Sequence, residues 1–128
     1  MRLLLDTCTF LWLTVDAPEL PDRARGLIAD PANELFLSAA SSWEIAVKHA
    51  LQRLPLPSPP ERFVPQQREA HGIEDLAINE ESTLHVGRLP ALHRDPFDRI
   101  LICQAIVHGL MILGPDPLIA QYPVRTTW

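Results

Sequence analysis

Short apolar runs recur along the chain, and each is too brief to form a buried helix. Continuous apolar runs of this length are typical of strands that are covered on both faces, as in a parallel sheet. We therefore predict strands at RLLL (2–5), ELFLS (34–38), IEDLAI (73–78), LMIL (110–113) and, near the C-terminus, VRTTW (124–128).

The segments between these runs carry helix signals. Asn79 followed by Glu80 and Glu81 is typical of an N-cap with acids in the first turn. The clearest helix covers 95–109 and is closed by Gly109. Further helices are expected over 9–16, 21–30, 38–54 and 79–90, with a short helix that ends near 71–72 after a proline-rich loop and a helical turn or two over 116–122.

Alternating strands and helices predict an α/β fold, a three-layer α/β/α sandwich with a mostly parallel central sheet. With 128 residues, 47% of them hydrophobic, the chain is expected to form a single domain, 1–128, with its own core. In open sheets of this kind, ligands bind beyond the carboxyl ends of the strands. Asp6 directly follows its apolar run, and Asp116 follows LMIL (110–113) after two intervening residues, so both carboxylates are expected at that edge.

Two further acids lie on apolar faces of predicted helices. At 100° per residue, Glu44 points with the apolar stripe of helix 38–54. A salt bridge to Lys48, one turn further on, is the alternative explanation. Asp98 shares a face with apolar residues of helix 95–109, but it is also the third residue after Asp95, which fits a capping box.

Taken together, these four acids indicate a metal site. If Asp6, Glu44, Asp98 and Asp116 gather in one pocket, they repel one another, and burying them unpaired costs several kcal/mol. Such a cluster persists when a cation binds it. All-oxygen ligation favours Mg²⁺ or Mn²⁺ over zinc.

Charge and composition limit the function. The net charge of −5 argues against a protein that coats nucleic acid through a basic surface, although a bound metal would still supply positive charge to phosphate. No apolar run approaches the roughly 18 residues of a membrane span, and the N-terminus lacks signal-peptide features. Cys8 and Cys103 have no paired spacing and are interpreted as reduced thiols of a cytoplasmic protein, with a disulfide as the alternative.

Other enzyme classes fit poorly. The sequence has no dinucleotide fingerprint, P-loop or nucleophile elbow. A different acidic-pocket protein, such as a phosphate-handling receiver or phosphatase, is a further alternative. Against it, DTCTF (6–10) lacks the second aspartate that a DxD-type phosphatase carries.

The chain resembles the PIN-domain ribonucleases, in particular the VapC-type toxins of bacterial toxin–antitoxin pairs. The likeness covers nearly the whole chain through four stretches in order: LLLDT with a following LW, SAASSWEIAVKHAL, HRDPFDRILICQA and LMILGPDPLIAQYPV. These stretches are similar to the family's first strand and acid, its Ser-x-x-Ser-x-Trp-Glu-Ile helix, its most specific motif, and the strand that leads to its last aspartate.

The resemblance implies a metal-dependent endoribonuclease in which Asp6, Glu44, Asp98 and Asp116 form an acidic quartet that holds Mg²⁺ or Mn²⁺. Asp6 and Asp98 would bind a metal directly, whereas Glu44 and Asp116 would bind a second metal or orient water. Asp95 is an outer candidate whose first role is capping. Candidate RNA contacts are Ser38, Ser42, Lys48, Arg94 and Arg99.

Two positions depart from the family pattern. Gly114 stands two residues before the last aspartate, where relatives often carry Thr or Ser, and Cys8 stands where many carry His. The first departure removes a hydroxyl near the site, close to Asp116 in the sequence. It also supports an alternative function, a catalytically retired PIN-like module that binds proteins.

The resemblance also implies partners. These are an RNA substrate and a cognate VapB-like antitoxin that lays a segment across the acidic cleft, in a homodimer or a toxin–antitoxin hetero-oligomer, with no membrane. A partner that brings Arg or Lys suits the negative net charge. Phe10, Trp12 and Leu13 are candidates for that groove or for a homodimer face, and core packing is their alternative role.

Overall fold

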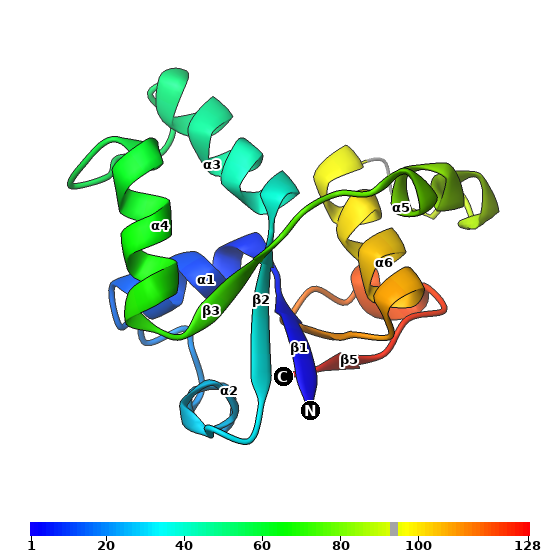
Figure 1. Cartoon of the computed structure of the whole chain (residues 1–128), viewed down its shortest axis with the longest axis horizontal. Helices are drawn as coiled ribbons and strands as arrows, with labels where there is room; N and C mark the ends of the chain where they lie inside the picture. The colour runs from blue at the N-terminus through cyan, green and yellow to red at the C-terminus, as the bar shows by residue number, and fades with distance from the viewer. Residues whose placement is uncertain (93–94) are drawn as a thin grey trace.

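The protein is described by a computed structural model covering residues 1–92 and 95–128 (Figure 1). Its strands form one sheet in the order β3-β2-β1-β4-β5, with every pairing parallel. Leu5 pairs with Leu37 on one side and with Leu113 on the other, so β1 is central. The strands are β1 (Arg2–Leu5), β2 (Glu34–Ser38), β3 (Ile73–Leu76), β4 (Met111–Leu113) and β5 (Thr126–Thr127).

Helices connect these strands at the predicted places. The elements are α1 (Thr7–Thr14), α2 (Asp22–Ala29), α3 (Ala39–Ala50), α4 (Pro60–Ala70), α5 (Glu80–Leu84), α6 (Pro96–His108) and the short 3₁₀ helices η1 (His85–Arg88) and η2 (Ile119–Gln121). Asn79 caps α5 as predicted, and its side chain accepts a hydrogen bond from the Ser82 amide. Gly109 ends α6 in the left-handed conformation, with φ of 68°.

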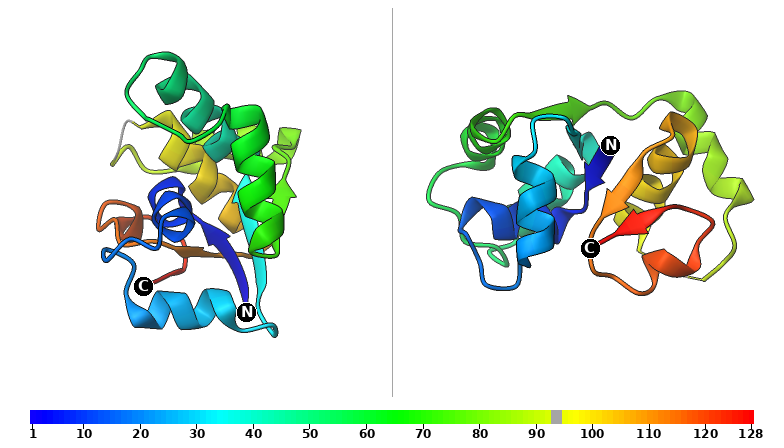
Figure 2. Two further views of the ribbon diagram at one scale, coloured as in Figure 1. Left: turned by 90° about the vertical axis from the view of Figure 1, so that its left-hand side faces the viewer. Right: turned by 90° about the horizontal axis from the view of Figure 1, so that it is seen from below.

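The sheet is covered on both faces, which confirms the three-layer architecture. Leu3 and Leu5 pack into one core with Phe10 of α1, whereas Leu4 packs into a second core with Ile102 of α6. Successive strand residues point to opposite faces, so three leucines in a row serve both cores. Seen from below, α1, α2 and α4 lie on one side of β1 and α6 lies on the other (Figure 2).

Some boundaries differ from the sequence prediction. α3 ends at Ala50 rather than near residue 54, because Gln52 adopts a left-handed φ of 58° that terminates the helix. Its buried stripe includes Glu44 as expected, whereas Leu51, which 100° per residue also places near that stripe, is 57% exposed. The predicted helix over 79–90 becomes α5 and the 3₁₀ turn η1.

Two further expectations concern the cysteines and the membrane. Cys8 and Cys103 are free thiols, as predicted, so the alternative of a disulfide between them is wrong. Among the described residues, 1–92 and 95–128, no helix has both the length and the apolar character to cross a membrane.

Candidate active site

The Asp6 carboxylate lies at the carboxyl end of the central strand and is 4% exposed. It caps α1, because its Oδ1 accepts hydrogen bonds from the Thr9 amide at 2.9 Å and from Cys8 Sγ at 3.2 Å. Burial raises the pKa of Asp6 most strongly, and the nearby charge of Asp116 raises it further, while the Thr9 and Cys8 hydrogen bonds oppose the shift. The structure therefore brings Asp6 and Asp116 together, as predicted from their places after two strands.

Asp116 lies three residues beyond the end of β4 and is half-buried. Its Oδ1 accepts a hydrogen bond from the Leu118 amide at 2.9 Å, which fixes the carboxylate in a turn before η2. The chain between β4 and Asp116 runs close to Asp6: the Asp6 amide donates to the Leu113 carbonyl, and Gly114 lies directly against the Asp6 carboxylate.

Glu44 occupies the buried face of α3 and is 7% exposed. Lys48 donates to Glu44 Oε2 at 2.6 Å, one helical turn further on. The salt bridge that was the alternative explanation for Glu44 is therefore present, and Lys48, which is half exposed, keeps its ammonium group near solvent. The negative charge of the buried Glu44 carboxylate is therefore already neutralised by the Lys48 ammonium group.

Asp95 and Asp98 lie at the N-terminus of α6. Asp95 is the N-cap, and its Oδ1 accepts from the Phe97 amide at 2.9 Å and from the Asp98 amide at 3.4 Å. The predicted capping role of Asp95 is confirmed. Asp98 is half-buried in the first turn, where an acid also suits the helix dipole.

The helices that carry these acids meet above the sheet edge. The rings of Trp43 on α3 and Phe97 on α6 have centroids 5.0 Å apart, so the neighbours Glu44 and Asp98 lie on adjoining helices. Thr7 of α1 donates to Ser41 of α3 at 2.9 Å. α1, α3 and α6 thus direct their N-termini to the same edge (Figure 1).

The donor chemistry of this edge fits a hard divalent cation. Asp6 and Asp116 supply neighbouring carboxylates, one of them buried and costly to ionise without a cation. Within the described parts of the chain, no group of three or more Asp, Glu, His or Cys side chains is close enough to hold one ion. Mg²⁺ commonly uses one or two carboxylates and keeps several waters, so the pair meets its need.

Cys8 does not act as a nucleophile in this arrangement. Burial, and next to it the Asp6 carboxylate, raises the pKa of Cys8 to about 12. Its thiol therefore stays protonated near neutral pH and donates to Asp6, which is a structural role.

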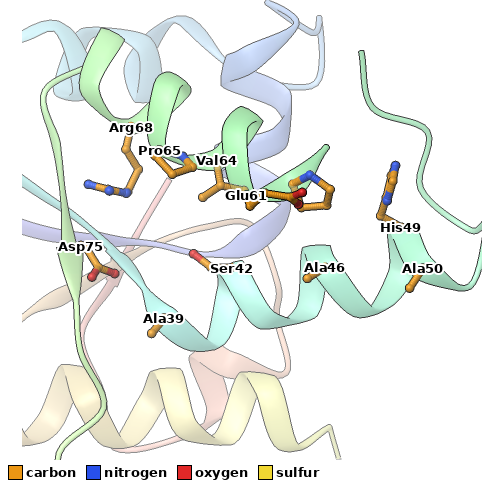
Figure 3. A pocket seen from close by; sticks show the side chains of 11 residues that line it. Ala39, Ser42, Ala46, His49, Ala50, Glu61, Val64, Pro65, Arg68 and Asp75 are labelled. Carbon is orange, nitrogen blue, oxygen red and sulfur yellow. The ribbon is translucent and has the colours of Figure 1, made fainter. Parts of the chain in front are cut away.

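The outer candidates are dispersed. Ser42 faces a cavity of about 540 Å³ between α3 and α4, together with Asp75 of β3 and Arg68 of α4 (Figure 3). Arg99 donates to the carbonyls of Pro90 and Val86 and to the Tyr122 hydroxyl, contacts that hold neighbouring segments together. The RNA-contact roles of Ser42 and Arg99 stay predictions.

Two more of these candidates can be placed. Ser38 is fully buried and caps α3 through a hydrogen bond from the Ala40 amide. Lys48 forms an ion pair with Glu44. Arg94 lies outside the described residues.

The apolar residues of α1 pack inward. Phe10 is fully buried, and Trp12 and Leu13 pack against the same core, with the Trp12 ring 5.9 Å from that of Trp128. Core packing, the alternative role, therefore accounts for Phe10, whereas the partly buried Trp12 and Leu13 stay candidates for the partner groove or the homodimer face.

One contact of the Asp6 carboxylate has no counterpart in the sequence pattern. Gly114 was treated as a missing hydroxyl, whereas the structure places the Asp6 carboxylate in the space where a side chain at 114 would begin. Only the parallel pairing of β1 with β4 brings these residues together, and no local sequence signal reports that contact.

The family model of the PIN domain matches residues 3–122. The chain therefore belongs to the PIN domain family.

Among curated proteins, the chain is 35% identical over 69 residues to ribonuclease VapC16 of Mycobacterium tuberculosis (strain ATCC 25618 / H37Rv). That match covers 54% of this chain and 49% of the relative, so the chain spans about half the length of the curated protein it matches.

Solved structures share the fold at low sequence identity. The chain is similar to a crystal structure of VapBC2 from Rickettsia felis bound to a DNA fragment from their promoter, with a TM-score of 0.74, 13% identity, and 99% and 98% of the two chains covered. It is also similar to VapBC-1 from nontypeable Haemophilus influenzae, with a TM-score of 0.65, 18% identity, and 99% and 97% covered.

Proposed function

We propose that this chain is a Mg²⁺- or Mn²⁺-dependent endoribonuclease that acts as the toxin of a toxin–antitoxin pair. The observation that carries the proposal is the buried Asp6 carboxylate beside Asp116 at the carboxyl end of the central strand of a PIN domain. The likeness to a protein named ribonuclease VapC16 supports RNA as the substrate.

Phosphodiester hydrolysis needs an activated water and stabilisation of the charge that develops on the phosphate oxygens. A divalent ion supplies both when it is bound. Asp6 and Asp116 would hold it. Asp98 of α6 would act on water or on a second ion, because no three such side chains among the described residues lie close enough to share one ion. Glu44, paired with Lys48, would orient water or accept a proton once the pair opens.

The backbone contributes positive potential that the net charge of −5 does not reveal. The N-termini of α1, α3 and α6 converge on the sheet edge, and each carries the partial positive charge of a helix dipole (Figure 1). An RNA phosphate placed there would face oriented amides as well as the cation. An acidic protein can therefore attract phosphate locally.

The test is cleavage of single-stranded RNA by the purified protein with Mg²⁺ or Mn²⁺. Asp6→Asn should lower the rate by about 10²–10³-fold, the loss typical of one electrostatic group in a preorganised site. Asp22→Asn is the matched control, because Asp22 is an exposed acid in the first turn of α2.

Chelator should abolish cleavage by the unmodified protein and by Asp22→Asn alike. Undiminished cleavage in Asp6→Asn, or in chelator, would contradict the proposed site. Persisting cleavage in Asp98→Ala would remove Asp98 from the site but leave the Asp6–Asp116 pair.

A partner follows from the same proposal. The similar structures VapBC2 and VapBC-1 are named as pairs. We infer that a VapB-like antitoxin binds this chain, and that adding the protein encoded beside it to the cleavage assay stops the reaction. Both would act in the cytoplasm, where RNA and antitoxin meet.

The retired module, which binds proteins without catalysis, is the second candidate. The Glu44–Lys48 pair favours it, because that carboxylate is neutralised without a metal. Its former support, the missing hydroxyl at position 114, is weakened by the contact between Gly114 and Asp6. Metal titration separates the two candidates, since a retired site should show no binding that depends on Asp6.

A further inference from the structure

Gly114 is packed directly against the Asp6 carboxylate. A Cβ atom built on Gly114 would lie 2.6 Å from Asp6 Cγ and 3.2 Å from Oδ1, with Oδ2 closer still. Separations below 3.0 Å do not occur for real Cβ atoms, so any other residue at position 114 requires Asp6 or the backbone to move.

The backbone conformation does not explain this glycine. Gly72 and Gly109 have left-handed φ values of 66° and 68°, which favour glycine, but Gly114 is not among the residues with positive φ. What restricts position 114 is the lack of room for a side chain beside Asp6. By comparison, a Cβ atom added to Gly26 would lie in open space.

Hydrogen bonds hold both Gly114 and the Asp6 carboxylate in place. The Gly114 amide donates to the Thr127 carbonyl at 3.1 Å, and the Asp6 amide donates to the Leu113 carbonyl at 3.2 Å. The Asp6 carboxylate is also fixed through Oδ1 by the Thr9 amide and Cys8 Sγ. Turning the carboxylate away from Gly114 would disturb the hydrogen bonds that cap α1.

We propose that Gly114 is a positioning residue whose missing side chain leaves the space in which the Asp6 carboxylate lies beside Asp116 to bind a divalent cation. The proposal rests on the proposed function, because it concerns the same cation. It gives Gly114 a positive role in the site and makes its lack of a hydroxyl incidental.

The direct test is Mn²⁺ binding by calorimetry to the full chain carrying Gly114→Ala. The added methyl group displaces the Asp6 carboxylate, so the Kd for Mn²⁺ should rise by about 10- to 100-fold, the loss typical when a partner that orients a metal ligand is removed. Gly26→Ala, which adds the same methyl group in open space, should bind Mn²⁺ as the unmodified chain does.

A double-mutant cycle without metal isolates the contact itself. Gly114→Ala should lower the thermal midpoint in chelator, whereas in an Asp6→Ala background the same change should cost little, because the carboxylate that met the methyl group is gone. If Gly114→Ala fails to fold, the Asp6→Ala/Gly114→Ala chain should still fold. Equal loss in both backgrounds, or two unfolded chains, would overturn the proposal.

The metal titration distinguishes this inference from the proposed function. If the unmodified chain and Gly114→Ala bind Mn²⁺ equally while Asp6→Asn does not bind it, the positioning role is wrong and the metal site stands. If the unmodified chain binds no Mn²⁺, both proposals fail. If only Gly114→Ala and Asp6→Asn lose affinity, and their combination loses no more than Asp6→Asn, both are supported.

Discussion

Asp6 serves as the N-cap of α1 and as the candidate metal ligand, and the two roles differ in what they require of its charge. A cap needs only an oxygen that accepts from the Thr9 amide, which Asn also supplies. A metal ligand needs the negative charge, which is expensive at a position that is 4% exposed. Without a metal, the buried negative charge of Asp6 therefore destabilises the fold, and a bound cation would neutralise that charge.

The stability of Asp6→Asn should reveal that cost. Burial raises the pKa of Asp6 above the unfolded value of 3.8, so its contribution is most favourable below that pH and is lost as pH rises through the folded pKa. In chelator at pH 7, where the buried carboxylate is charged, Asp6→Asn should therefore raise the free energy of unfolding.

Urea denaturation between pH 3 and pH 8 measures this effect. The gain should vanish at the acidic end, where Asp6 is protonated in both states. A variant that is less stable than the unmodified chain at pH 7 would contradict the assignment of a costly charge to this carboxylate.

Gly114 illustrates which part of the site the sequence could not supply. The positions of Asp6 and Asp116 at the sheet edge could be predicted because acids that follow apolar runs can be recognised in the sequence. The contact between Gly114 and Asp6 depends on the register in which Leu5 pairs with Leu113, and residues so far apart along the chain leave no local pattern. The Glu44–Lys48 pair was foreseen as an alternative because its spacing is local.

At the scale of elements, strands were easier to predict than helix ends. The apolar runs of β1, β2 and β4 are buried on both faces and appear in the sequence without interruption. The end of α3 was placed too late, because Gln52 is left-handed and neither Gly nor Asn marks the stop. Where a cap residue was present, as at Asp95 and Gly109, the boundary was correct.

The N-terminus of α6 provides a test that separates capping from metal binding. Asp95→Ala removes the acceptor for the Phe97 and Asp98 amides and should lower the free energy of unfolding by about 1 kcal/mol. Asp95→Asn keeps that acceptor and should retain both stability and Mn²⁺ affinity. If Asp95→Asn binds Mn²⁺ as weakly as Asp6→Asn, then Asp95 is a ligand and not only a cap.

At the scale of the whole molecule, the all-parallel sheet gathers the chemistry at one edge. With β1 in the middle, the carboxyl ends of β2 and β4 flank Asp6, and α1, α3 and α6 begin at that edge (Figure 1). The opposite edge carries the turns that enter the strands. A cation held by Asp6 and Asp116 at this edge would therefore contact residues from both ends of the chain.

Such a bridging cation should stabilise the entire fold. At a free Mn²⁺ concentration of about 100 times Kd, the free energy of unfolding should rise by about 2.7 kcal/mol, which is roughly 10 °C in thermal midpoint for a chain of this size. Asp6→Asn should show no such shift at the same concentration. A retired module predicts no metal-dependent shift in either chain, and calorimetric scans with Mn²⁺ or chelator decide between them.

The position of β1 has a consequence for biosynthesis. Strand β1 emerges from the ribosome first and can pair with β2 early, but its other neighbour, β4, is made roughly a hundred residues later. Until β4 docks, Asp6 has neither Asp116 beside it nor Gly114 behind it. Under the proposed function, a nascent or truncated chain would therefore lack the complete metal site and would spare the RNA around it, including the message from which it is being translated.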